Sequence, residues 1–155
     1  MTYQANALAR KNLERRLAPL RGMEALARPP RGWVKAIREA LGMTTAQLAR
    51  RLGVSQPRIV QAERSEVEDS MTLRSLREMA AGLNCRLVYA LVPNEPLDDL
   101  LRDRASKIAA TRLASANHTM KLENQALAPG DLEIERQRLI EQLISGSPRR
   151  LWDDD

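Results

Sequence analysis

The side chains best placed to do chemistry lie late in the chain, in the stretch Thr119-Met-Lys-Leu-Glu-Asn124. Thr119 supplies a hydroxyl, Glu123 a carboxylate four positions later, and Asn124 an amide directly after it. Residues four apart are neighbours on one face of a helix, so a helix would present the hydroxyl and the carboxylate together. This pattern has two interpretations, either a solvated turn of an ordinary helix or a contact offered to a partner molecule.

Catalytic and metal-binding patterns are lacking in the rest of the sequence. One Cys and one His cannot supply the ligands of a zinc site without a large carboxylate contribution. His118 has no Cys or Ser companion in a recognisable catalytic pattern, and there is no glycine-rich phosphate loop. Asp98-Asp99 opens a predicted helix, where the helix dipole explains it. We therefore expect no catalytic residue, no metal and no cofactor, and we expect Cys85 to be a small buried hydrophobe.

Charge is distributed unevenly along the 155 residues. Residues 1–64 hold 13 Lys/Arg against 4 Asp/Glu, whereas residues 65–155 hold 12 against 16. The first part is therefore the candidate for binding a polyanion. The N-terminus carries charges where a signal peptide has its apolar stretch, and no run of about eighteen apolar residues occurs. We expect a cytoplasmic protein with no membrane partner.

Composition and periodicity predict the elements that must position these residues. The absence of Phe and the abundance of Leu, Ala, Arg, Glu and Gln favour helices around an aliphatic core. Prolines and glycines at 28–32 and 129–130 mark boundaries. Helical patterns cover residues 3–18, 33–41, 44–53, 56–63, 71–83, 97–127 and 131–144, and a short β-strand is predicted over 84–92.

Two short predicted helices, 44–53 and 56–63, meet under tight constraints. A helix-turn-helix needs a small residue where the helices cross, a glycine able to take positive φ, and apolar residues that lock the second helix. Ala49 and Gly53 meet the first two demands. The third is met by Leu48, Leu52, Val54 and Ile59. With its flanking helices and the pattern Ser-Gln-x-x-Ile-x-Gln-x-Glu over 55–63, this part of the chain resembles the helix-turn-helix family of phage-type repressors.

That resemblance implies that the second helix enters the major groove with its N-terminal residues against base edges. The expected base-reading residues are Gln56, Arg58 and Gln61, because Gln pairs well with adenine and Arg with guanine. The residues expected near phosphates are Thr45, Arg50, Ser55 and Arg64. Pro57 departs from the commoner polar residue at its position. The alternative is that these polar side chains only solvate a small bundle.

Such domains usually bind double-stranded operators as two-fold dimers. The predicted strand over 84–92 has no obvious mate in the chain. Pairing with its symmetry copy would satisfy its edge, so we expect a homodimer.

A second resemblance covers about residues 5–128. The stretches ALARKNLERRLAPLR, RPPRGWVKAIREALGM, LNCRLVYALVP and ANHTMKLENQAL resemble the family called mobile mystery protein A, which is encoded beside a Fic-domain partner. TMKLEN fits the pattern [Ser/Thr]-x-x-x-Glu-[Gly/Asn] of the helix that silences Fic enzymes, which transfer AMP from ATP to protein hydroxyls. The resemblance implies that Glu123 binds the enzyme arginine that otherwise holds the ATP γ-phosphate, while Thr119 and Asn124 fix the helix against the enzyme.

The expected fold is mainly α, a phage-repressor-like helix-turn-helix bundle with one short β-strand and a C-terminal helical extension. The expected parts are a basic helix and linker (1–30), the DNA-binding domain with its strand (31–92), an extension with the inhibitory motif (93–147) and a disordered tail (148–155). The expected function is that of an antitoxin that binds its own operon and inhibits a Fic AMP-transferase. The alternative is a transcriptional regulator with no Fic-inhibitory role.

Overall fold

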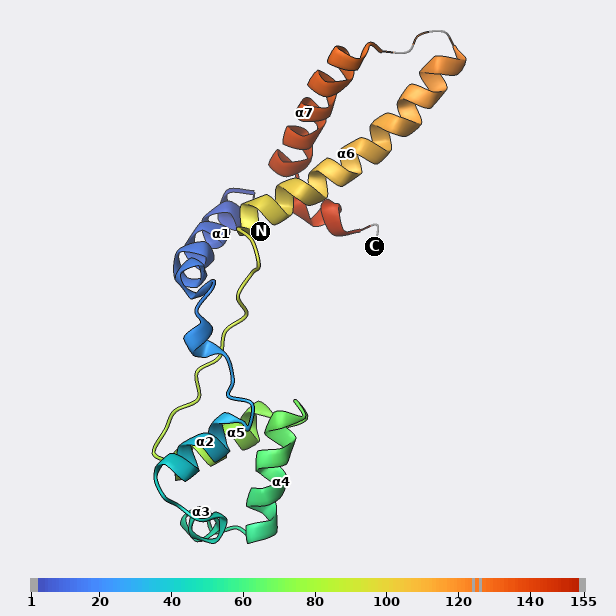
Figure 1. Ribbon diagram of the computed structural model, residues 1–155. Coiled ribbons are helices and arrows are strands. Elements are labelled where there is room, and N and C mark those ends of the chain that lie inside the picture. Colours follow the sequence, from blue (N-terminus) through green and yellow to red (C-terminus); the bar gives the residue numbers. More distant parts are fainter. Residues whose placement is uncertain (1–2, 124, 126, 154–155) are drawn as a thin grey trace. The chain divides into compact units, whose positions relative to one another are not determined.

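The computed structural model describes residues 3–123, 125 and 127–153, and the chain divides into two compact units. Residues 22–90 are called here the central unit, and residues 1–21 together with 91–155 the terminal unit. Both consist of helices joined by irregular segments (Figure 1). The prediction of a mainly α fold is therefore confirmed.

The central unit, all of whose residues are described, holds four α-helices and a short 3-10 helix, η2 (Glu24–Leu26). The α-helices are α2 (Trp33–Ala40), α3 (Thr45–Leu52), α4 (Gln56–Val67) and α5 (Leu73–Gly82). Its core is formed by Val34, Leu48, Ala49, Ile59, Met79 and Leu83. A Cβ added at Gly82 would lie 2.7 Å from Cγ of Leu52. Glycine therefore permits the close approach of α5 to α3.

A carboxylate from α4 closes the N-terminus of α2. Glu66 accepts hydrogen bonds from the backbone N–H groups of Trp33 at 2.7 Å and Val34 at 3.0 Å. These N–H groups have no partner inside their own helix, and the helix dipole favours a negative charge beside them. Gly32 precedes them with φ 83°, and a Cβ there would lie 2.8 Å from Oε2 of Glu66. The glycine thus makes room for the carboxylate.

The loop before α2 is tied to the C-terminal end of α4. Arg28 donates hydrogen bonds to the backbone carbonyls of Glu66 and Val67 and to the carboxylate of Asp69, the last at 2.6 Å. The last carbonyls of a helix have few intrahelical donors, and the guanidinium supplies donors to two of them. The proline-rich segment is therefore packed against the end of α4, which it contacts through Arg28 before the prolines and through the N–H groups of Trp33 and Val34 after them.

The predicted strand over 84–92 is not formed. A strand requires a hydrogen-bonded neighbour, and no strand of any kind occurs within the described residues. The chain leaves the core after Leu83 through Asn84, which takes φ 55°. Cys85 then lies exposed, so the expectation that it is buried is wrong.

The terminal unit contains α1 (Tyr3–Leu17), η1 (Ala18–Leu20), α6 (Leu97–Leu122), α7 (Pro129–Ser145) and η3 (Pro148–Trp152). Figure 1 shows α6 and α7 running side by side as a hairpin. Its core holds Leu101, Ala105, Ala109, Ile140 and Leu151. Residues 148–152 form η3 and Leu151 is fully buried, so the prediction of a disordered tail is wrong for them.

One arginine joins the first helix of the terminal unit to the segment before α6. Arg21 donates to both carboxylate oxygens of Glu14, at 2.5 and 2.9 Å, and to the backbone carbonyls of Pro93 and Glu95 at 2.8 and 3.2 Å. Glu14 also accepts a bond from the backbone N–H of Leu97 at 3.3 Å. The Arg21 guanidinium, helped by that N–H, lowers the pKa of Glu14 below its usual value.

Candidate nucleic-acid interface

The turn between α3 and α4 has the geometry that its sequence predicts. Gly53 takes φ 65° and ψ 31°, the left-handed conformation that favours glycine. The N–H of Val54 bonds the carbonyl of Ala49 at 3.0 Å, which satisfies the end of α3. Ala49 is buried, and Ile59 at 0% exposure anchors α4 in the core. The two helices are therefore held at a fixed crossing.

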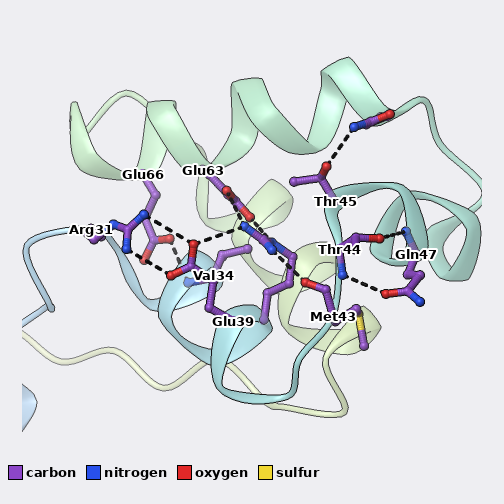
Figure 2. A network of polar contacts seen from close by, with 11 residues as sticks. Arg31, Val34, Glu39, Met43, Thr44, Thr45, Gln47, Glu63 and Glu66 are labelled. Atoms are coloured by element: carbon purple, nitrogen blue, oxygen red, sulfur yellow. Dashed lines mark hydrogen bonds and ion pairs between the residues drawn. The ribbon is translucent and has the colours of Figure 1, made fainter.

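The start of α3 is closed by a capping box. The N–H of Gln47 donates to the hydroxyl of Thr44 at 3.1 Å, and the N–H of Thr44 donates to the amide oxygen of Gln47 at 2.7 Å. Figure 2 shows these two side chains turned toward each other beside Thr45. Both partners satisfy backbone groups that lack an intrahelical bond. The cap thus sets the position at which Thr45 begins the helix.

An ion pair inside the central unit holds α4 against α2. Nε of Arg38 lies 2.5 Å from Oε1 of Glu63, and both side chains are 9% exposed. Arg38 also donates to the carbonyl of Met43 at 2.7 Å, so the network reaches the loop before α3 (Figure 2). The hydrogen bond to Glu63 raises the pKa of Arg38. Glu63, the last residue of the motif in the sequence, is therefore structural.

Gln56, the first of the predicted base-reading residues, is exposed and oriented by α3. Its Nε2 donates to Oγ1 of Thr45 at 2.9 Å. A glutamine amide carries two N–H donors and one oxygen acceptor, and this bond uses one donor. One donor and one acceptor are left, which is the set that pairs with N7 and N6 of adenine in the major groove.

Gln61 and Arg58 also lie exposed on α4, and each contacts a polar neighbour. Gln61 donates to the hydroxyl of Ser65 at 3.2 Å, which again leaves one N–H and the oxygen. Arg58 lies 3.4 Å from Glu78 of α5. The spacing of Gln61 and Ser65 by four is visible in the sequence, whereas the approach of Glu78 depends on how α5 packs.

The predicted phosphate-contacting residues differ in their surroundings. Arg50, Ser55 and Arg64 are exposed, and Thr45 is half-buried. Arg64 pairs with Glu68 at 2.7 Å, which raises the pKa of Arg64. Together they place a hydroxyl at the start of α3, a cation in its last turn, and a hydroxyl and a cation at and along α4. Arg51, in contrast, donates to the carbonyl of Gly82 at 2.9 Å and so ties α3 to the end of α5.

The second predicted site lies at the end of α6. Thr119 and Glu123 are exposed, and Glu123 follows the last helical residue with φ −94° and ψ 6°. The hydroxyl of Thr119 donates to the carbonyl of Ser115 at 3.2 Å. Asn124 lies outside the described residues. The carboxylate sits beside the negative end of the helix dipole, so it does not contribute to the stability of α6 through that dipole.

Within the described ranges, no group of His, Cys, Asp or Glu is arranged to hold a metal ion. No helix there is long and apolar enough to cross a membrane.

The central unit is the part of the chain that matches a known protein family. A family model described as Helix-turn-helix matches residues 34–89, from α2 to the segment after α5. Comparison with curated proteins and with solved structures gave no match. Residues 34–89 are therefore a helix-turn-helix domain of the kind that binds DNA, as found in transcription regulators.

Proposed function

We propose that the chain is a sequence-specific regulator that reads double-stranded DNA with α4. The observation that carries this proposal is the bond from Gln56 to Thr45, which leaves the amide with the donor and acceptor that adenine requires. Arg58 and Gln61 lie on the same helix and supply further base-edge contacts. Thr45, Arg50, Ser55 and Arg64 set the register of the helix on the phosphates.

Base reading is tested by selecting preferred duplexes from a random pool with the wild-type chain and with Gln61→Ala. We expect the variant to lose preference at one position while keeping salt-sensitive binding to mixed-sequence DNA. Gln137→Ala, on the exposed surface of α7, is the matched control and should leave the selected sequence unchanged. Equal weakening on every sequence would contradict base reading by Gln61.

We also propose that two copies bind the operator together through residues 84–92. Val88, Tyr89 and Leu91 are 75%, 63% and 88% exposed, and the segment is rich in β-forming residues. Pairing with a second copy would cover these side chains and satisfy the backbone. Light scattering should give a dimer for the wild type and a monomer for Tyr89→Pro, because proline removes a ladder donor. A wild-type monomer at high micromolar concentration would reject this arrangement.

A second function, inhibition of a Fic AMP-transferase, is proposed for the end of α6. It is supported by the resemblance of TMKLEN to Fic-inhibitory helices and by the exposure of Thr119 and Glu123. A carboxylate matches the fork of a guanidinium and would compete with the ATP γ-phosphate for the enzyme arginine. Leu122 and Leu127, which are 77% and 36% exposed, lie within four residues of Glu123 in the sequence and offer apolar area. The chain would then be an antitoxin with two functions, and its cytoplasmic location stays a prediction.

Co-expression of the Fic-domain enzyme with the wild type, Glu123→Ala or Glu141→Ala tests this second function. Glu141 is an exposed carboxylate of α7 and gives the same change of charge. We expect AMP transfer to return only with Glu123→Ala, while the free energy of unfolding changes by no more than about 0.5 kcal/mol, as for an ordinary surface position. Unchanged AMP transfer with Glu123→Ala would leave the chain as a DNA-binding regulator alone.

A further inference from the structure

The net acidic second part of the chain contains a basic stretch with no carboxylate. Between residues 104 and 122, α6 carries Arg104, Lys107, Arg112 and Lys121 and neither Asp nor Glu. The balance over residues 65–155 hides this stretch, because the acidic residues lie before and after it. A surface of one sign of charge attracts ligands of the opposite sign.

Three of these cations surround one hollow on α6. The hollow has a volume of about 240 Å³ and is lined by Arg104, Lys107, Ile108, Thr111 and Arg112. Arg104 is held in place, since its Nε donates to the carbonyl of Leu151 at 2.6 Å and its guanidinium lies 5.8 Å from the centre of the Trp152 ring. The η3 helix, anchored by the buried Leu151, therefore fixes one cation of the set before any ligand arrives.

The other two cations are available for a ligand. Lys107 and Arg112 are exposed, and neither forms an ion pair with any residue that the structure describes. Two carboxylates of the neighbouring α7 are engaged within their own helix. Glu133 lies 3.6 Å from Arg136, and Glu135 lies 3.6 Å from Arg138. Lys107 and Arg112 therefore have no ion-pair partner among the described residues.

We propose that this face of α6 binds the phosphate backbone of duplex DNA, as a contact separate from α4 and indifferent to sequence. Arginine and lysine side chains are among the groups that proteins use for phosphate oxygens, and the hollow brings three of them together. The hydroxyl of Thr111 donates to the carbonyl of Lys107 at 3.1 Å and is not counted as a phosphate donor. Release of counterions from the DNA drives such contacts. DNA is favoured over other polyanions because the same chain carries the helix-turn-helix domain. The inference rests on the proposed DNA-binding function and extends it to the terminal unit.

The test is the salt dependence of binding to a mixed-sequence duplex, measured by fluorescence anisotropy on the full chain. Lys107→Gln/Arg112→Gln removes two cations of the hollow, and Arg149→Gln/Arg150→Gln removes two exposed cations of η3 as the control. We expect the slope of log K against log salt to become shallower by about 1.8 for the first variant, since each lost phosphate contact contributes about 0.9. The control should retain the wild-type slope. Circular dichroism checks the fold, and single substitutions replace the pair if the double variant is unstable.

Four results would overturn the proposal. One is the same slope change in both double variants, and another is a wild-type slope in Lys107→Gln/Arg112→Gln. A third is that inorganic phosphate stabilises the wild type but not this variant, while the two proteins bind the duplex equally well. That result would identify a site for small anions. A fourth is normal duplex binding with loss of binding to the Fic-domain enzyme, which would identify an acidic protein as the ligand. If the wild type bound no duplex, the proposed DNA-binding function would also be rejected. If Gln61→Ala lost its sequence preference but Lys107→Gln/Arg112→Gln kept the wild-type salt slope, only this inference would be rejected.

Discussion

Arg38 and Glu63 form an ion pair at 2.5 Å in the interior of the central unit, with each side chain only 9% exposed. The pair joins α2 to the helix that carries the predicted base-reading residues. Because a buried charge without its partner is costly, the two residues depend on each other. The position of α4 relative to α2 is therefore linked to this contact.

Removing one member of the pair should be far more damaging than replacing both. Glu63→Ala leaves the Arg38 guanidinium buried and uncompensated, so we expect the free energy of unfolding to fall by about 3–5 kcal/mol. The double variant Arg38→Met/Glu63→Leu should recover most of that loss, because apolar side chains of similar size can fill the space. Urea denaturation of the single and double variants gives both values. A single variant within about 1 kcal/mol of the wild type would show that the pair does not stabilise the unit.

The N-terminus of α2 provides a second stability prediction. Glu66→Ala removes the acceptor of the Trp33 and Val34 N–H groups, and the loss of a cap costs about 0.5–2 kcal/mol. Thermal denaturation should show a lower midpoint for this variant.

Two glycines with positive φ flank α2. Gly32 and Gly42 take φ 83° and 67°, and of the two only Gly32 would bring a Cβ against another residue, Oε2 of Glu66 at 2.8 Å. Gly42→Ala should cost roughly 1–2 kcal/mol for its positive φ. Gly32→Ala should cost more, because φ 83° with ψ 157° is a conformation adopted almost only by glycine and because the carboxylate must move. Equal midpoints of thermal denaturation for the two variants would contradict this prediction.

Thr45 offers a test of how Gln56 is oriented. Thr45→Val keeps the shape of the side chain but cannot accept the Gln56 N–H, so part of the preference for adenine should be lost. A complete contact between Gln56 and adenine discriminates against other bases by about 1–3 kcal/mol. The loss in Thr45→Val should stay below this value, and the loss in Gln56→Ala should approach it. Thr45→Ser restores the acceptor and should restore the preference. If Thr45→Val weakens binding to all sequences equally, Thr45 contacts phosphate without orienting Gln56.

Acid should loosen the contact between Glu14 and Arg21. The guanidinium lowers the pKa of Glu14 from its ordinary value of 4.5, so the ionised form stabilises the fold. The contribution is present above pH 4.5 and is lost as the pH falls through the lower folded value. The protection factors of the α1 backbone amides, which compare observed with intrinsic exchange at each pH, should therefore fall below that pH in the wild type. Glu14→Gln should remove this pH dependence, and Glu141→Gln should keep it.

Much of the fold follows from local patterns in the sequence. The helices, the threonine caps at Thr44 and Thr72 and the left-handed turn at Gly53 each depend on residues within a few positions of one another. The strand over 84–92 is not confirmed, because β-forming residues specify a strand only when a neighbour supplies hydrogen bonds, and the described residues of one chain supply none. The prediction of a disordered tail was wrong because Leu151 packs into the core formed by α6 and α7. The polar residues around Leu151 in the sequence give no sign of that contact.

By itself, the sequence determined the helix-turn-helix and the exposure of Gln56, Arg58 and Gln61, since helical period and turn chemistry are properties of short segments. The base-reading and inhibitory roles stay predictions. Tertiary structure alone decided which groups meet across the chain, such as Glu66 at the start of α2 and Glu78 beside Arg58. It also held Arg104 of α6 against Leu151 and Trp152 of η3. Contacts of this kind depend on how whole helices pack, and short-range spacing carries no information about the partner that lies twenty or more residues away.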